Sequence, residues 1–113
     1  MFETLRTIVY PVSDLATAKV WWTDLLGSAP YFDEPYYVGF DVGGNEVGLV
    51  PDPEEQSPTA YWRVRDVAAA YQRLLELGST AHEEPHEVGG GIVTAAVRDS
   101  SANLIGVISV PGE

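Results

Sequence analysis

The chain carries one sequence pattern twice, and this repetition constrains the fold more than any single motif does. Thr7 and Asp14 of the first copy recur as Thr59 and Asp66 at one constant spacing. A second constant spacing relates two further pairs, which are Asn45 with Asn103 and Gly48 with Gly106. Internal repeats fold as similar units that bury their apolar faces together. We therefore expect two copies of one folding unit within 113 residues, the size of a single domain.

The first copy opens with a strand and a capped helix. Leu5–Val12 is apolar and β-branched, which predicts a strand. Ser13 or Asp14 can cap the following helix, and Gly27 suits the left-handed position that ends it. Between them, apolar residues recur at helical spacing, namely Leu15, Ala18, Trp22, Leu25 and Leu26. Three short strands are expected after this helix, at Ala29–Asp33, Tyr37–Val42 and Glu46–Val50.

The second copy repeats this order. Asp66 is the expected helix cap and Gly78 the expected stop, and the apolar stripe between them is Val67, Ala70, Tyr71, Leu74 and Leu77. The strands expected after it are Ser79–Glu83, Ile92–Arg98 and Leu104–Val110. Each copy thus has the order β-α-β-β-β, with module one at residues 1–51 and module two at residues 59–113. Residues 52–58 are rich in proline and acids and are expected to form the linker.

Composition excludes several classes of function. The chain has 17 acidic and 6 basic residues, for a net charge of −11, which argues against nucleic acid and against an anionic membrane surface. The same charge favours either solubility alone or a cationic ligand. No cysteine is present, so disulfides and thiol chemistry are excluded. Neither a signal peptide nor a membrane-spanning apolar run is visible, and a cytoplasmic protein is expected.

Two blocks carry a resemblance to a known family. One is Val12-Ser13-Asp14-Leu15-Ala16 leading to Trp21-Trp22 and Leu26-Gly27, and the other runs from Arg98 to Gly106. With their doubling, these blocks resemble the vicinal oxygen chelate superfamily, which includes glyoxalase I, extradiol dioxygenases and bleomycin resistance proteins. The resemblance implies an α+β fold in which two tandem βαβββ modules form a curved mixed sheet around a cup-shaped cavity, with the helices outside. It also implies pairing of modules within one chain or across a homodimer.

Metal-dependent members of that superfamily hold a metal with four ligands, usually His and Glu, on the first and last strands of each module. By motif alignment these positions are Thr7, Gly48, Thr59 and Gly106 here. Glycine offers no side chain, and a threonine hydroxyl is a poor ligand for a divalent transition metal. We therefore expect no metal and no other cofactor. Small residues at these positions are also expected to leave room for a ligand.

Other motifs have weaker support. His82-Glu83-Glu84-Pro85-His86 matches the zincin pattern, but Pro85 would break the helix that this pattern requires, so a polar strand end and turn is expected. Gly89-Gly90-Gly91 lacks the following helix and lysine of a phosphate loop and indicates a tight turn. Three loop serines, Ser57, Ser100 and Ser101, have no histidine at a spacing that supports a nucleophilic triad.

Strand alternation predicts which side chains line the cup, because alternate residues face opposite sides of a sheet. The expected ligand-binding residues are Thr7, Val9, Tyr37, Glu46, Gly48, Thr59, Tyr61, Arg63, Gly106 and Ile108. An aromatic-lined cavity with a few polar groups is typical of small-molecule sites. The aromatic residues could equally close the core or a dimer interface. Arg63 could anchor a carboxylate or phosphate, or it could form a salt bridge with Glu46.

The sequence therefore predicts a metal-independent small-molecule-binding protein that forms a homodimer. It would sequester or carry a partly aromatic ligand, either with or without a positive charge. The alternative is an isomerase or lyase of the same fold, for which Glu46 is the candidate base. A third option is an interaction module without a ligand, which a filled cup would favour.

Overall fold

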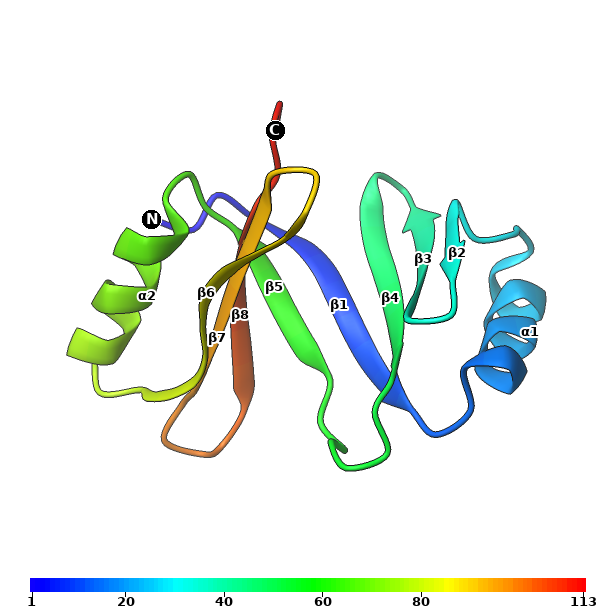
Figure 1. Cartoon of the computed structure of the whole chain (residues 1–113), viewed down its shortest axis with the longest axis horizontal. Helices are drawn as coiled ribbons and strands as arrows, with labels where there is room; N and C mark the ends of the chain where they lie inside the picture. The colour runs from blue at the N-terminus through cyan, green and yellow to red at the C-terminus, as the bar shows by residue number, and fades with distance from the viewer. The chain divides into compact units, whose positions relative to one another are not determined.

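The structure, a computed structural model, describes residues 1–113 and has the element order of two β-α-β-β-β modules (Figure 1). This order confirms the predicted α+β class and the internal repeat. By compactness the chain divides into Thr7–Pro58, which we call module one, and Met1–Arg6 with Thr59–Glu113, which we call module two.

The first six residues therefore belong with module two, in contrast to the sequence boundary that assigned residues 1–51 to module one. Side-chain and backbone contacts explain this difference. Phe2 stacks on Trp62 with ring centroids 5.3 Å apart, and the Glu3 amide donates to the Arg63 carbonyl at 2.9 Å.

Module one is a four-stranded mixed sheet with one helix. Its elements are β1 Thr4–Val12 (from Thr7 onward), α1 Leu15–Leu26, β2 Phe32–Glu34, β3 Tyr37–Val42 and β4 Asn45–Pro51. The strand order is β2-β3-β4-β1, in which β1 runs parallel to β4 and the other pairs are antiparallel. The Asp14 carboxylate accepts from the Thr17 amide at 3.1 Å, and Gly27 at φ 75° ends the helix, so both expected caps of α1 are confirmed.

Module two repeats this arrangement. Its elements after Met1–Arg6 are β5 Thr59–Arg63, α2 Val67–Glu76, β6 Thr80–Gly89, β7 Ile92–Arg98 and β8 Leu104–Ser109. The order is β5-β8-β7-β6, with β5 parallel to β8. The Asp66 carboxylate accepts from the Ala69 amide at 3.0 Å and caps α2 as expected.

Two expected strands differ from the observed ones by more than one residue at an end. The strand expected at Ala29–Asp33 is only Phe32–Glu34, because Pro30 has no amide to contribute to a sheet. The strand expected at Ser79–Glu83 extends to Gly89 and includes Pro85. This extension is possible because β6 is the last strand of the module-two sheet and pairs with β7 through register shifts, and edges and bulges tolerate proline.

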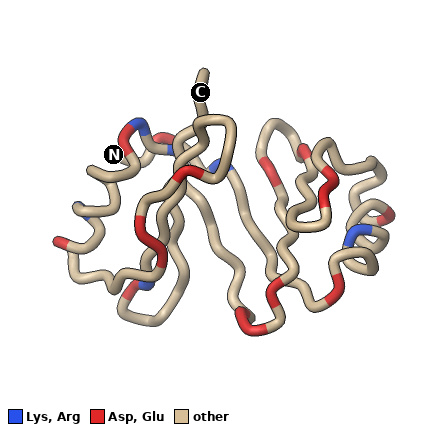
Figure 2. The backbone as a smooth tube through the Cα atoms, in the orientation of Figure 1, with Lys and Arg blue, Asp and Glu red and all other residues tan.

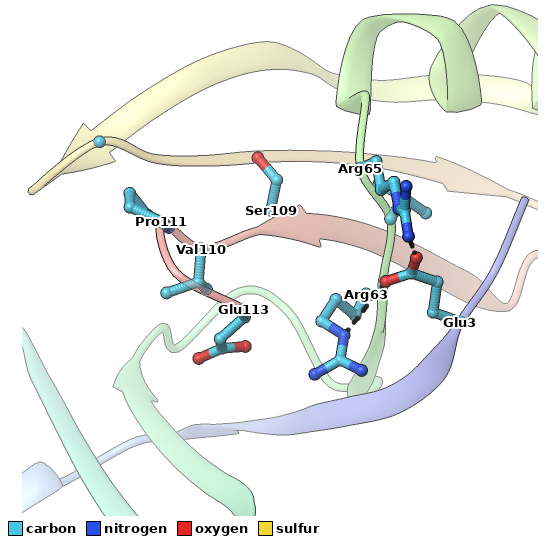
Figure 3. Close-up of a pocket in the computed structure, with 9 residues that line it drawn as sticks. Glu3, Arg63, Arg65, Ser109, Val110, Pro111 and Glu113 are labelled. Atoms are coloured by element: carbon cyan, nitrogen blue, oxygen red, sulfur yellow. Dashed lines mark hydrogen bonds and ion pairs between the residues drawn. The ribbon is translucent and has the colours of Figure 1, made fainter.

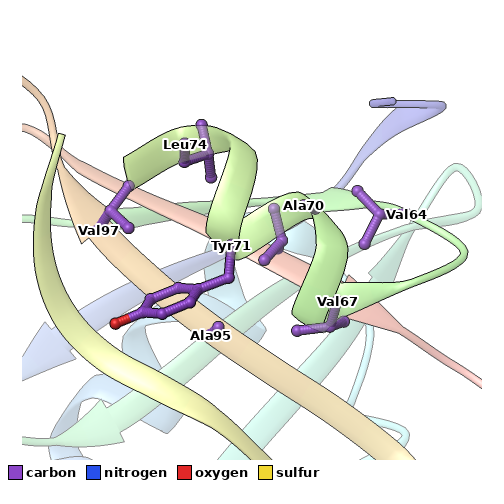
Figure 4. Packing of buried hydrophobic residues seen from close by; sticks show 8 residues of the cluster. Val64, Val67, Ala70, Tyr71, Leu74, Ala95 and Val97 are labelled. Carbon is purple, nitrogen blue, oxygen red and sulfur yellow. The ribbon is translucent and has the colours of Figure 1, made fainter. Parts of the chain in front are cut away.

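Each module buries one sheet face under its helix. In module one the buried centre is Val38, Phe40 and Leu49, covered by Leu15, Ala18, Trp22 and Leu26 of α1. In module two α2 packs on β7 and β8 through a larger cluster (Figure 4), which consists of Val64, Val67, Ala70, Tyr71, Leu74, Ala95, Val97 and Val107.

Leu25 and Leu77 were expected in the helical stripes, yet both are exposed. Leu26, rather than Leu25, lies one helical turn beyond Trp22 and faces the sheet. Leu77 follows Glu76, the last helical residue of α2, and so lies outside the stripe. Neither helix has the length and apolar character needed to cross a membrane.

We predict that Leu49→Ala lowers the free energy of unfolding by about 2–5 kcal/mol, because Leu49 is 0% exposed and its removal leaves a cavity. Leu77→Ala is the matched control, since Leu77 is 62% exposed, and its effect should stay within about 0.5 kcal/mol. Urea denaturation measures both. Equal losses in the two variants would contradict the core assignment.

Candidate functional site

The face of the module-one sheet that points away from α1 carries polar and aromatic side chains. Val38, Phe40 and Leu49 pack beneath α1, so the alternate residues Tyr37, Gly39 and Gly48 lie on the opposite face. Val9 is the register partner of Gly48, and Thr7 is the register partner of Glu46. The five residues predicted for module one therefore lie on the same sheet face and on neighbouring strands. They are Thr7, Val9, Tyr37, Glu46 and Gly48.

Two hydroxyl groups hold the Glu46 carboxylate on this face. Thr7 Oγ1 donates to Glu46 Oε1 at 3.0 Å, and the Tyr31 hydroxyl donates to Glu46 Oε2. Thr7 is 3% exposed and Glu46 is half-buried. The parallel register of β1 and β4 brings Thr7 and Glu46 together. Two donors on separate oxygens fix the orientation of the carboxylate.

Tyr31 was not among the predicted binding residues. It lies just before β2, where its amide donates to the Gly39 carbonyl at 3.0 Å. This bond brings the tyrosine to the strand that pairs with β4, and its hydroxyl reaches Glu46. No spacing rule connects Tyr31 to Glu46 in the sequence.

A tyrosine ring covers the glycine at the last-strand position of module one. A Cβ atom added to Gly48 would lie 2.8 Å from Tyr37 Cε1 and would overlap the phenol oxygen of that ring. Tyr37 is two residues from Gly39, the register partner of Gly48, so its ring leans diagonally across the strands. Gly39 is constrained in a similar way, because a Cβ there would lie 2.7 Å from Glu46 Oε2.

Module two fills the equivalent space with a different tyrosine. Tyr61 is the direct register partner of Gly106, and a Cβ added to Gly106 would lie 2.8 Å from Tyr61 Cγ. Ile108, another predicted residue, is buried beside it and pairs with both Arg63 and Thr94. Burial raises the pKa of Tyr61 to about 12, and the nearby charge of Glu83 acts in the same direction. The phenol of Tyr61 is therefore neutral across the physiological range.

The sequence matches the Glyoxalase/Bleomycin resistance protein/Dioxygenase superfamily over residues 4–107. The chain belongs to this superfamily. A comparison with curated proteins finds no match.

Solved structures support the same fold. A superfamily member from Vibrio splendidus 12B01 is 20% identical with a TM-score of 0.71, covering 94% of this chain and 98% of the other. Methylmalonyl-CoA epimerase from Mycobacterium tuberculosis is 19% identical with a TM-score of 0.72, covering 96% and 89%. A structure described as an NAD-dependent benzaldehyde dehydrogenase from Legionella pneumophila is 15% identical with a TM-score of 0.75, covering 92% and 97%. At these identities the similarity shows the fold alone.

The superfamily's metal-ligand positions do not fit a divalent metal in this member. Thr7 donates its hydroxyl to Glu46, and tyrosine rings cover Gly48 and Gly106. Thr59 is the remaining position, half-buried at the start of β5. No group of three or more His, Asp or Glu side chains in residues 1–113 is placed so that it could hold a metal ion. The expectation that the two glycines leave room for a ligand is wrong, because the rings of Tyr37 and Tyr61 occupy that space.

The zincin-like segment is extended rather than helical. Residues 82–86 lie within β6, so the expected strand is confirmed but the turn is not. His86 Nδ1 lies 3.0 Å from the Glu84 carbonyl oxygen. An extended segment does not place two histidines one helical turn apart, so this superfamily member has no zincin geometry there.

Among the module-two residues predicted from the sequence, Thr59, Tyr61 and Arg63 alternate along β5, and Gly106 and Ile108 alternate along β8. Within module two, the acid that faces Arg63 is Glu3, with Oε1 at 3.4 Å from Arg63 Nε. The sequence did not indicate this pair. A ligand-binding role for these residues stays a prediction.

We predict that Gly106→Ala destabilises the protein by about 1–3 kcal/mol, as overpacking does, and that Gly48→Ala costs less. The new methyl group of Gly106→Ala meets the root of the Tyr61 side chain, which cannot move aside, whereas that of Gly48→Ala meets the movable end of Tyr37. Urea denaturation measures both. Adding Tyr61→Ala should remove most of the cost of Gly106→Ala, and strictly additive losses in this double variant would contradict the ring contact.

We further predict that stability falls as the pH rises from about 10 to about 12. The folded state raises the pKa of Tyr61 to about 12, against an ordinary value near 10, so the folded state binds the proton more tightly than the unfolded state. This contribution is complete below about pH 10 and is lost as pH rises through 12, a loss on the order of 2–3 kcal/mol.

Denaturant titrations at several pH values compare the wild type with Tyr61→Phe, in which this part of the loss should vanish. Tyr36→Phe is the control, because Tyr36 is 66% exposed. The difference between variants isolates Tyr61 from the lysine and arginine residues that titrate in the same range. Parallel curves for the wild type and Tyr61→Phe would contradict the burial of this phenol.

Proposed function

We propose that this superfamily member is a metal-independent binding protein that sequesters or carries a small, partly aromatic, cationic molecule. The observation that carries the proposal is the Glu46 carboxylate, held in a fixed orientation by Thr7 and Tyr31 on the face that also carries the Tyr37 ring. A fixed anion beside aromatic rings attracts an organic cation through charge and through the ring faces. The net charge of −11 supports the same ligand class through long-range attraction.

Binding of this kind needs no catalytic group. The ring positions and the carboxylate are set before the ligand arrives, because strand register places Thr7 beside Glu46 and Tyr37 packs on a glycine. Groups that are already ordered lower the entropic cost of association. Assembly as a homodimer, a cytoplasmic location and the contribution of the module-two residues to this ligand stay predictions from the sequence.

Titration calorimetry with benzyltrimethylammonium as the probe tests the proposal. We predict measurable binding to the wild type and a Kd that is roughly tenfold higher or more in Glu46→Gln, because the neutral amide removes a charge interaction worth more than about 1.4 kcal/mol. The neutral analogue benzyl alcohol should bind more weakly to the wild type and should not distinguish the two proteins.

Glu34→Gln is the matched control. Glu34 is an exposed acid at the end of β2, so this variant has the same change in net charge in the same module. It should bind the probe as the wild type does. An equal loss in both variants would show a long-range charge effect only, and unchanged binding in Glu46→Gln would remove Glu46 from the site.

A second candidate function is an isomerase or lyase in which Glu46 removes a proton from a carbon next to a carbonyl group. The close contact between the Tyr31 hydroxyl and Glu46 favours it, because a carboxylate base and a phenol donor then stand together.

Methylmalonyl-CoA epimerases share this fold, and methylmalonyl-CoA is a suitable probe. Deuterium uptake at its α-carbon in heavy water distinguishes the candidates. The enzyme would catalyse uptake that falls by about 10²–10⁴-fold in Glu46→Gln, whereas a binding protein would catalyse none.

A further inference from the structure

Half of the basic side chains of the protein gather in one part of module two. Arg6, Arg63 and Arg65 are three of the six lysine and arginine residues in the sequence. Figure 2 shows basic positions, in blue, near the ends of the chain. The acids that pair with them are Glu3 and Glu113. Three side-chain cations thus meet two side-chain anions in a chain whose net charge is −11.

Four of these five groups, Glu3, Arg63, Arg65 and Glu113, line a pocket of about 770 Å³. It lies where β5 leads into α2 and where β8 ends, and Figure 3 shows its lining. The lining combines charged residues with a hydroxyl and an apolar wall, and consists of Glu3, Arg63, Val64, Arg65, Gly91, Ser109, Val110, Pro111 and Glu113. All of these residues belong to module two.

Both acids already have strong partners. Arg6 binds the Glu113 carboxylate with two hydrogen bonds, of 2.9 and 3.0 Å, and these bonds lower the pKa of Glu113. Glu3 accepts a hydrogen bond of 2.9 Å from Arg65 Nε, which is the main cause of the lowered pKa of Glu3. One carboxylate therefore serves each of Arg6 and Arg65.

Arg63 has no carboxylate of its own, because its charge acts on Glu3 and Glu113, which Arg65 and Arg6 already bind. Its Nε lies 3.4 Å from Glu3 Oε1, which is close enough for an ion pair, but this nitrogen is buried and makes no hydrogen bond. The side chain as a whole is 33% exposed, and its two terminal nitrogens point away from Glu3 (Figure 3). A buried donor without an acceptor costs free energy that a suitable ligand can recover.

We propose that this pocket binds a small monocarboxylate, with the Arg63 guanidinium as its anchor. A guanidinium presents parallel N–H donors that match the two oxygens of a carboxylate. A single guanidinium whose Nε makes no hydrogen bond suits a monoanion better than a phosphate dianion. Ser109 supplies a hydroxyl, and Val64, Val110 and Pro111 supply an apolar wall for the body of the ligand. This site uses none of the residues assigned to the cation in module one, so either proposal can fail without the other.

The test is a titration of ¹⁵N-labelled protein with benzoate, followed by NMR. The Arg63 Nε–H resonance and the amides of Ser109 and Val110 should shift together with one Kd. In Arg63→Gln the Kd should rise roughly tenfold or more, because hydrogen bonds to a charged donor are lost. Arg63→Lys, which keeps the charge but not the paired donors, should give an intermediate value.

Arg73→Gln is the matched control and should bind benzoate as the wild type does, because Arg73 lies on α2, pairs with Glu76 and is not part of the pocket. Neutral benzamide should cause no comparable shifts. The proposal is overturned if benzoate leaves the wild-type Arg63 Nε–H resonance unmoved, if benzamide binds equally well, or if inorganic phosphate binds more tightly than benzoate at the same residues. The wild-type titration decides the matter even if a variant does not fold.

Discussion

The packing of a tyrosine ring on a glycine backbone is the contact on which the polar sheet face of each module depends. Tyr37 lies over Gly48 and Tyr61 lies over Gly106, and in each case a single methyl group would collide with the ring. The glycines stand at positions where the resemblance to metal-dependent members predicts an acidic ligand, and here tyrosine rings fill the space beside them. The two modules reach this result differently, because Tyr61 is on the strand parallel to β8 while Tyr37 is on the strand antiparallel to β4.

The Tyr37 ring covers Gly48, and the nearest acid on the same strand, β4, is Glu46. Glu46 lies on the same face as Gly48, and its two oxygens accept from Thr7 and Tyr31. Thr7 stands at the other position of the module where the resemblance predicts a ligand, and here its hydroxyl orients a carboxylate. Module two has no such acid, because the residue at the position of Glu46 in the repeat is the buried Leu104. The repeat thus preserves the fold while only one copy carries an oriented anion.

The sequence predicted those parts of the fold that depend on local chemistry. The bounds of α1 follow from a capping aspartate and a terminal glycine. Asp66 caps α2 in the same way, but the C-cap of α2 is Leu77, one residue before the expected Gly78. Strand alternation placed Tyr61 on the same face as Gly106, where its ring lies. It could not predict the lean of each ring over a glycine, which depends on close packing between neighbouring strands. It likewise missed the continuation of β6 through Pro85, because the tolerance of a sheet edge for proline appears only once the strand order is known.

The contact of Glu3 with Arg63 was also outside the reach of sequence patterns, since no periodicity connects residues so far apart in the chain. Glu3 contacts both Arg63 and Arg65, and one carboxylate cannot neutralise two guanidinium groups. The shorter contact goes to Arg65, which is largely exposed, and the longer one to the more buried Arg63. A protein that used Glu3 only for stability would gain more from the reverse arrangement, because screening by water weakens an exposed pair. The observed arrangement keeps the more buried guanidinium available for another anion.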